Sequence, residues 1–141
     1  MNPAGSILPA GALPAGVLLD TSIIIAHFRN DPGVTAHLIA SSALYVPWIV
    51  LGELRYGALR AQRREAHLAL IREFLQIAIP LFPDLGTSEG YGDLKAELAA
   101  VGRPIPDNDL WIASLARQYA LPLATRDAHF SWVANLTTLV W

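Results

Sequence analysis

Short apolar runs alternate with longer segments of helical periodicity from residue 17 to the end of this chain, and no other feature constrains the fold as strongly. The apolar runs predict five short strands, at about residues 17–20, 44–46, 80–82, 121–125 and 139–141. Between them the apolar spacing predicts helices at about 21–29, 33–41, 48–59, 62–78, 87–101 and 107–119. Strands separated by helices pair in parallel, and the helices cover both faces of the sheet. The prediction is therefore an α/β fold, a three-layer α/β/α sandwich around a mostly parallel sheet of four to five strands.

Composition favours a single folded domain over residues 17–141. Of the 141 residues, 53% are hydrophobic and 16% are charged, which is enough for a real core and leaves apolar surface for a partner. The chain has no cysteine, which excludes disulfides, thiolate zinc sites and cysteine nucleophiles. Its four histidines show no ligand spacing among themselves, so a histidine metal cage is not expected. With a net charge of -2, any contact with nucleic acid must come from a local basic patch.

Residues 1–16 carry no charged side chain and contain the tetrapeptide Leu-Pro-Ala-Gly twice, which is typical of a flexible leader. They lack the basic segment of a secretory signal peptide, and proline and glycine interrupt each apolar run. No apolar run reaches the roughly 18 residues that a membrane helix needs. We therefore expect a cytoplasmic protein with no membrane contact.

Acidic residues follow two of the predicted strands at the points where those strands end. Asp20 comes directly after the first strand, and Asp127 lies two residues beyond Thr125 at the end of the fourth. Right-handed crossovers bring the carboxyl ends of parallel strands to one edge of the sheet, where ligands bind. Asp107 and Asp109 lie in the first turn of the helix that leads into the fourth strand. Each of these aspartates could also act only as a helix cap, because aspartate is favoured at helix starts.

Glu53 lies inside the most apolar of the predicted helices, between Gly52 and Gly57. Glycine inside a helix costs about 1 kcal/mol relative to alanine, so two of them indicate that another backbone or a substrate comes close. The alternative is an ordinary glutamate on the solvent-facing side of the helix.

Four carboxylates could thus converge on one site, those of Asp20, Glu53, Asp109 and Asp127. Without a cation among them they would raise one another's pKa values and destabilise the fold. A hard divalent ion, Mg²⁺ or Mn²⁺, resolves this conflict because it prefers oxygen ligands. Such a site suits the hydrolysis of a phosphodiester bond. The neighbours that could orient a carboxylate or a water from a second sphere are Thr21, Ser22, Asp107 and Thr125.

Four segments carry these acids, in the order LLDTSIII, LGELRYG, IPDNDLWIA and TRDAHF. Together they resemble the PIN domain, and specifically the VapC-type toxins of bacterial toxin–antitoxin pairs. The resemblance covers roughly residues 17–140. It implies an α/β/α sandwich, a Mg²⁺- or Mn²⁺-dependent endoribonuclease, a homodimer and a cognate antitoxin of the VapB type. By position, the family's acidic residues match Asp20, Glu53, Asp109 and Asp127. Its hydroxyl positions match Thr21 or Ser22, and Thr125. Asp107 is an extra acid beside the motif, and we prefer Asp109 as the metal ligand.

An RNA substrate would need positive charge near the acids. Arg60, Arg63, Arg64 and His67 are spaced at i, i+3, i+4 and i+7, which predicts one basic stripe if the helix is continuous there. Such a stripe could contact RNA, could meet the acidic residues of a partner, or could be only a solvated helix face. The candidates for RNA or partner contact are Arg55, Arg60, Arg63, Arg64 and Arg126.

Two other folds that gather aspartates at strand ends fit the sequence less well. A phosphoacceptor receiver domain needs a lysine opposite its acids, and the single lysine, Lys95, lies inside a predicted helix. A haloacid-dehalogenase-like phosphatase needs a second aspartate two residues after the first, where this chain has Ser22. A catalytically silent PIN-like module that only binds a protein partner or RNA stays open as the alternative.

Overall fold

The computed structural model describes residues 12–141, which contain one sheet of five short parallel strands. The strands are β1 (Val17–Leu19), β2 (Leu44–Pro47), β3 (Ile79–Leu81), β4 (Leu123–Ala124) and β5 (Thr138–Leu139). Their order is β3-β2-β1-β4-β5, so the chain starts at the centre, builds one half of the sheet, and then returns past β1 to build the other. The winding reverses between β1 and β4, and such a switch point leaves a crevice at the carboxyl ends of the two strands.

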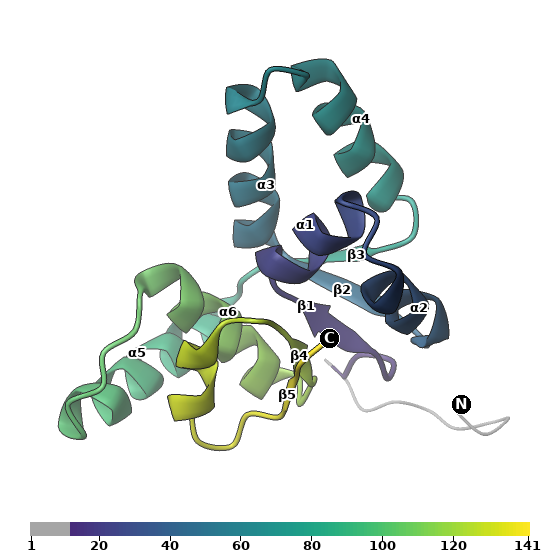
Figure 1. Cartoon of the computed structure of the whole chain (residues 1–141). Coiled ribbons are helices and arrows are strands. Elements are labelled where there is room, and N and C mark those ends of the chain that lie inside the picture. The colour runs from purple at the N-terminus through teal and green to yellow at the C-terminus, as the bar shows by residue number, and fades with distance from the viewer. Residues whose placement is uncertain (1–11) are drawn as a thin grey trace, which may run out of the picture.

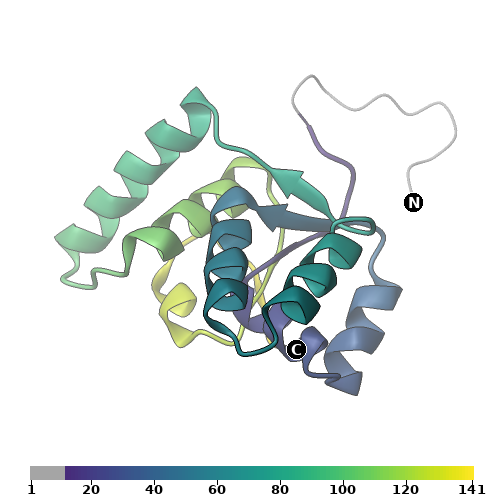
Figure 2. The ribbon, with the colours of Figure 1, turned by 90° about the horizontal axis from the view of Figure 1, so that it is seen from above.

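Six α-helices and one 3₁₀ helix belong to the described part of the chain. They are α1 (Thr21–Phe28), α2 (Pro32–Ala40), α3 (Trp48–Arg60), α4 (Arg64–Phe74), α5 (Leu85–Ala100), α6 (Asp107–Gln118) and the 3₁₀ helix η1 (Ala128–Trp132). Figure 1 shows α1, α3 and α4 gathered together, while α5 and α6 pack as a pair on another flank, and Figure 2 shows α2 and α5 at opposite ends of the molecule. The predicted α/β architecture around a parallel sheet is confirmed. Within residues 12–141, none of these helices is both long and apolar enough to cross a membrane.

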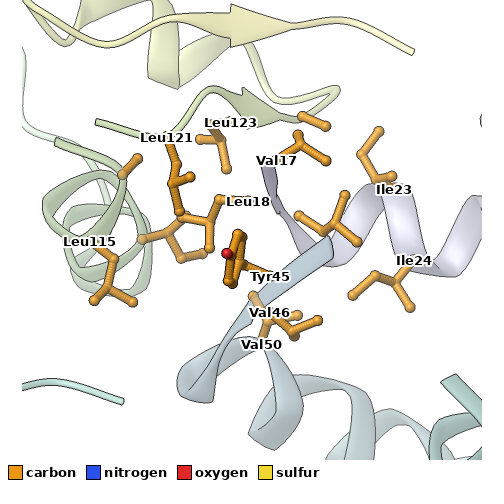
Figure 3. Packing of buried hydrophobic residues seen from close by; sticks show 14 of the residues in the cluster. Val17, Leu18, Ile23, Ile24, Tyr45, Val46, Val50, Leu115, Leu121 and Leu123 are labelled. Carbon is orange, nitrogen blue, oxygen red and sulfur yellow. The ribbon is translucent and has the colours of Figure 1, made fainter. Parts of the chain in front are cut away.

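All three residues of β1 are buried, as expected for a central strand with helices on both faces of its sheet. Figure 3 shows Leu18 and Tyr45 of the sheet in the same cluster as Ile24 of α1 and Leu115 of α6. Burial of a side chain of this size stabilises a fold by about 1.5–3 kcal/mol. This core therefore holds the carboxyl ends of β1 and β4 in place.

The last residues of the predicted leader are attached to the sheet. The hydroxyl of the buried Tyr45 donates a hydrogen bond to the carbonyl oxygen of Pro14 (2.7 Å). Gly16 lies so close to the chain before β2 that a Cβ there would be 2.5 Å from the carbonyl oxygen of Ala43. A buried tyrosine hydroxyl needs an acceptor, and Pro14 supplies it for Tyr45. The contacts of the folded domain therefore begin before residue 17. Residues 1–11 of the predicted leader lie outside the described residues.

The predicted basic stripe requires one continuous helix, and the structure has two. α3 ends at Arg60, Ala61 is extended (φ -75°, ψ 152°), and α4 begins only at Arg64. The Arg64 guanidinium turns back and donates to the carbonyl oxygen of Leu59 (2.9 Å), in the last turn of α3, where carbonyls lack helical partners. The stripe from Arg60 to His67 was predicted on the condition of a continuous helix, and that condition is not met, because the helical spacing crosses a break.

Other predicted elements are present with shifted ends. The helix expected to reach residue 78 ends at Phe74, and the chain then turns into the edge strand β3. The fourth strand keeps only Leu123–Ala124 in its ladder. The helix η1, which follows β4 closely, was not predicted, because five residues of 3₁₀ helix are too few to show a periodic pattern.

Candidate active site

Asp20 lies directly after β1 and caps α1 with its own side chain. Its Oδ1 accepts a hydrogen bond from the backbone N–H of Thr21 (2.7 Å), and its Oδ2 accepts from the hydroxyls of Thr125 (2.7 Å) and Ser22 (3.3 Å). Asp20 is only 7% exposed, and this burial raises the pKa of its carboxyl in spite of those hydrogen bonds. One carboxylate therefore serves as a helix cap and also lies at the carboxyl edge of the sheet.

Thr125 links the ends of β1 and β4 at the switch point. Its hydroxyl donates to Asp20 and accepts from the backbone N–H of Asp127 (3.0 Å). The Asp127 side chain accepts from the backbone N–H of His129 (2.9 Å) and so caps η1. One hydroxyl thereby connects the segments that carry Asp20 and Asp127.

Asp109, in the first turn of α6, lies against the other acids. Its side chain is 16% exposed. Burial, followed by repulsion from the charges of Asp127, Asp20 and Glu53, raises the pKa of Asp109 to about 6, while the nearby His129 opposes this shift. Three acids from three other segments therefore act on one carboxylate.

Asp107 lies in the same turn but is held elsewhere. It accepts a hydrogen bond from the Tyr91 hydroxyl (2.9 Å) and pairs with Lys95 (3.3 Å), both on α5. These contacts, the Tyr91 hydrogen bond first, hold the pKa of the Asp107 carboxyl below its usual value. The structure brings Asp109 to the acid cluster and leaves Asp107, predicted as a second-sphere group, in contact with α5.

Glu53 reaches the same region from the middle of α3. Burial raises the pKa of its partly buried carboxyl, the nearby Thr21 hydroxyl opposes this, and repulsion from Asp20 adds to it. Thr21 Oγ1 is buried without a hydrogen bond of ordinary length in the described part of the chain, so its interaction with Glu53 is weak. Glu53 is thus part of the charge cluster, at its α3 side.

The glycines on either side of Glu53 do not mark a close backbone approach. A Cβ placed on Gly52 or Gly57 would meet nothing within 4 Å among the described residues. The prediction that another backbone comes close to these glycines is therefore wrong, because both glycines are exposed. Gly57 and Glu53 instead border a groove of about 310 Å³ between α1, α3 and α4. The apolar side chains lining this groove are Ile25, Phe28, Leu54, Ala58, Ala61 and Ile71.

His129 completes the cluster, and sequence reasoning missed it. Its Nδ1 lies 3.1 Å from Asp127 Oδ1 and 3.9 Å from Asp109 Oδ2. One ligand atom from each of these three residues lies within 4.8 Å of the other two, a set that could hold a metal ion. Spacing among the histidines could not reveal it, because its partners are aspartates, Asp127 two residues earlier and Asp109 on α6. The available signal was a histidine two residues after Asp127 in the segment TRDAHF.

The candidate arginines lie in several different settings. The Arg126 guanidinium pairs with Asp31 (2.9 Å) and donates to the carbonyl oxygen of Trp141 (2.8 Å). The Arg60 guanidinium lies over the ring of Tyr56, 5.3 Å from its centre. Contact with RNA or a partner stays a prediction for all of these arginines, and no ion pair within residues 12–141 involves Arg55, Arg60, Arg63 or Arg64.

Comparison with known proteins agrees with this fold. Residues 17–136 match the PIN domain, so the chain belongs to the PIN-domain family. Within that family it is similar to VapC proteins. The tRNA(fMet)-specific endonuclease VapC of Shigella flexneri is 32% identical over 127 residues, which cover 88% of this chain and 96% of that protein.

Two solved structures show the same fold. A DNA-bound VapBC from Salmonella typhimurium matches with a TM-score of 0.84 at 26% identity, over 89% of this chain and 98% of the matched chain. VapBC-5 from Mycobacterium tuberculosis, described as a member of the VapBC family of toxin–antitoxin systems, matches with a TM-score of 0.72 at 29% identity, over 91% and 100%. The predicted resemblance to PIN-domain proteins of the VapC type is confirmed.

Proposed function

We propose that this chain is a divalent-metal-dependent endoribonuclease that acts as the toxin of a toxin–antitoxin pair. The observation that carries the proposal is the meeting of acids from separate segments. Asp109 and Asp127 offer ligand atoms within 4.8 Å of each other. Asp20 and Glu53 lie near enough for their charges to raise the pKa of Asp109. The names of relatives, such as the endonuclease VapC of Shigella flexneri and the ribonuclease VapC1 of Haemophilus influenzae, support nuclease activity.

The donor chemistry fits Mg²⁺ or Mn²⁺. Buried carboxylates that raise one another's pKa are stabilised by a cation, and in the described part of the chain no lysine or arginine pairs with Asp20, Asp109 or Asp127. These three residues would hold the ion, and Glu53 would complete the acidic site. A bound ion supplies Lewis acidity and lowers the pKa of a coordinated water.

The chain's own groups prepare the site before substrate arrives. Hydrogen bonds from Thr21, Ser22 and Thr125 hold both oxygens of Asp20, so this carboxylate does not need to reorient. Glu53 combines a raised pKa with a place at the border of the groove, which suits it to accept a proton from a water that attacks phosphorus.

An antitoxin of the VapB type is the proposed partner. The groove between α1, α3 and α4 is largely apolar, and Glu53 on its border connects it with the acid cluster. An amphipathic helix could bury its apolar face in such a groove. The toxin–antitoxin structures that share this fold support a partner of that kind. The homodimer that the resemblance implies stays a prediction, which size-exclusion chromatography with light scattering checks.

Cleavage of RNA by the purified chain, freed of any antitoxin, tests the proposed activity. We expect cleavage of structured RNA with Mg²⁺ or Mn²⁺, no cleavage after chelation, and a loss of more than about 100-fold in Asp20→Asn, which removes a ligand charge. Asp93→Asn, at an exposed position on α5, is the matched control and should cleave like the wild type. Equal cleavage by the wild type and Asp20→Asn, or none by the wild type, would favour the silent binding module.

A further inference from the structure

We propose that His129 binds the metal ion directly through Nδ1, beside Asp109 and Asp127, and that this nitrogen ligand makes the centre prefer Mn²⁺ over Mg²⁺. The inference rests on the proposed function, because it requires a divalent ion at the acid cluster. It adds a ligand that the four-carboxylate prediction does not contain, and it decides between two ions that the sequence leaves open.

The distances fit coordination of one ion by all three groups. Two ligands at about 2.1 Å from an octahedral ion lie about 3.0 Å apart when adjacent and about 4.2 Å apart when opposite. His129 Nδ1 lies 3.1 Å from Asp127 Oδ1, close to the value for adjacent ligands, and 3.9 Å from Asp109 Oδ2, between the two values. The ligand atoms of Asp109 and Asp127 lie within 4.8 Å of each other. Only small shifts of the side chains are therefore needed to close a shared coordination sphere.

The backbone of η1 holds the imidazole at this place. The N–H of His129 donates to Asp127 Oδ1 (2.9 Å), so the two residues are joined by a capping hydrogen bond as well as by their side chains. The ring of Trp132 packs edge to face against the imidazole, with the ring centres 5.4 Å apart. His129 is thus confined between the acids and an aromatic ring, yet its side chain is 47% exposed and open to an incoming ion.

An ion pair between His129 and Asp127 would produce the same short distance without any metal. The two explanations differ at the nitrogen: an ion pair needs a protonated Nδ1, whereas a ligand needs a free lone pair on that atom. They also differ in metal preference. Imidazole suits first-row transition ions, including the manganese of helical carboxylate–histidine centres, whereas Mg²⁺ favours oxygen ligands and water.

Pulsed electron paramagnetic resonance of Mn²⁺ bound to the full chain reads the nitrogen contact directly. The protein is first stripped with a chelator and then loaded with one equivalent of Mn²⁺. We expect a ¹⁴N coupling in the wild type and its loss in His129→Asn, which keeps a polar side chain of similar reach. His37→Asn, which replaces an exposed histidine on α2, is the matched control and should keep the coupling. Circular dichroism checks that each variant is folded.

Competition between the two ions gives a second readout that does not depend on cleavage. We expect His129→Asn to weaken Mn²⁺ binding by roughly tenfold and Mg²⁺ binding by less than about twofold, because only the transition ion gains from the nitrogen. A wild type without ¹⁴N coupling, a coupling that persists in His129→Asn, or equal losses for both ions would overturn the inference. If RNA cleavage stays metal-dependent in that case, the proposed function stands without this ligand, whereas failure to bind Mn²⁺ overturns both.

Discussion

Asp109 bears the largest electrostatic cost in the acid cluster. Burial and the neighbouring acids raise its pKa to about 6, against 3.8 for an unperturbed aspartate. Between these two values the folded chain holds the proton more tightly than the unfolded chain does. The free energy of unfolding of the metal-free protein therefore falls as the pH rises through this window. Above it, the ionised carboxylate remains a cost that a bound cation offsets.

Asp109→Asn should stabilise the metal-free protein at neutral pH, because asparagine has no charge to repel. We expect the free energy of unfolding by urea, measured with chelator at pH 7.5, to rise by about 1–3 kcal/mol. The difference from the wild type should shrink toward zero near pH 4, where Asp109 itself is protonated. An excess of Mn²⁺ should reverse the order, since the variant lacks a ligand. A variant less stable than the wild type at both pH values would contradict this account of Asp109.

Thr125→Val tests the hydroxyl that joins the two strand ends while keeping the shape of the side chain. Asp20 loses a hydrogen-bond donor, and the backbone N–H of Asp127 loses an acceptor. We expect a thermal unfolding experiment to show destabilisation by about 1–3 kcal/mol. Thr138→Val, on β5, is the control, because no side-chain hydrogen bond of Thr138 is present in the described part of the chain. Equal effects of the two substitutions would show that the bridge contributes nothing.

The helices that carry two of the acids are capped by those same acids. Asp20 and Asp127 accept backbone hydrogen bonds in the first turns of α1 and η1. Loss of such a cap typically costs about 0.5–2 kcal/mol, so alanine at either position would disturb an element as well as a site. Asparagine caps a helix about as well as aspartate but carries no charge. The substitution to asparagine therefore removes the charge and keeps the cap. For this reason the activity test uses Asp20→Asn.

Substitution of alanine for glycine should have opposite effects on stability at two positions, because their surroundings differ. On the exposed side of α3, alanine at Gly52 would meet no atom within 4 Å and should stabilise the helix by about 0.5–1 kcal/mol. At Gly16, before β1, the same change would place Cβ 2.5 Å from the carbonyl oxygen of Ala43 and should destabilise the protein by about 1–3 kcal/mol. Calorimetry of both variants checks these opposite signs. A loss of stability in Gly52→Ala would contradict the open space beside this face of α3.

Over the whole molecule, the reversal of winding between β1 and β4 determines where the acids meet. The two strands are neighbours in the sheet although more than 100 residues separate them, as the 105-residue separation of the Thr125–Asp20 hydrogen bond shows. The groove that we assign to the antitoxin lies on the α1, α3 and α4 side of this edge. Partner binding and catalysis would thus share Glu53 at their common border.

Removal of residues 1–11 should leave the folded unit intact. The contacts that attach the N-terminal segment involve Pro14 and Gly16, and the match to the PIN domain begins at residue 17. We expect the same unfolding temperature and the same RNA cleavage as for the full chain. Removal through residue 16 should instead cost about 1–3 kcal/mol, because the Tyr45 hydroxyl loses its acceptor. A less stable protein after the shorter deletion would contradict the prediction of a flexible leader.

Local patterns in the sequence predicted the order of strands and helices, and they predicted that Asp20 and Asp127 each follow a strand at one edge of a parallel sheet. These properties depend on periodicity, on turn residues and on the handedness of crossovers, all of which can be read locally. The preference for Asp109 over Asp107 needed the packing of α6 to confirm that Asp109 faces the other acids, and only that packing brings His129 to them. The tertiary structure also decided that a break after Arg60 divides the arginines. Those outcomes depend on how far a helix is rotated and where it stops, and packing against residues distant in the chain sets both.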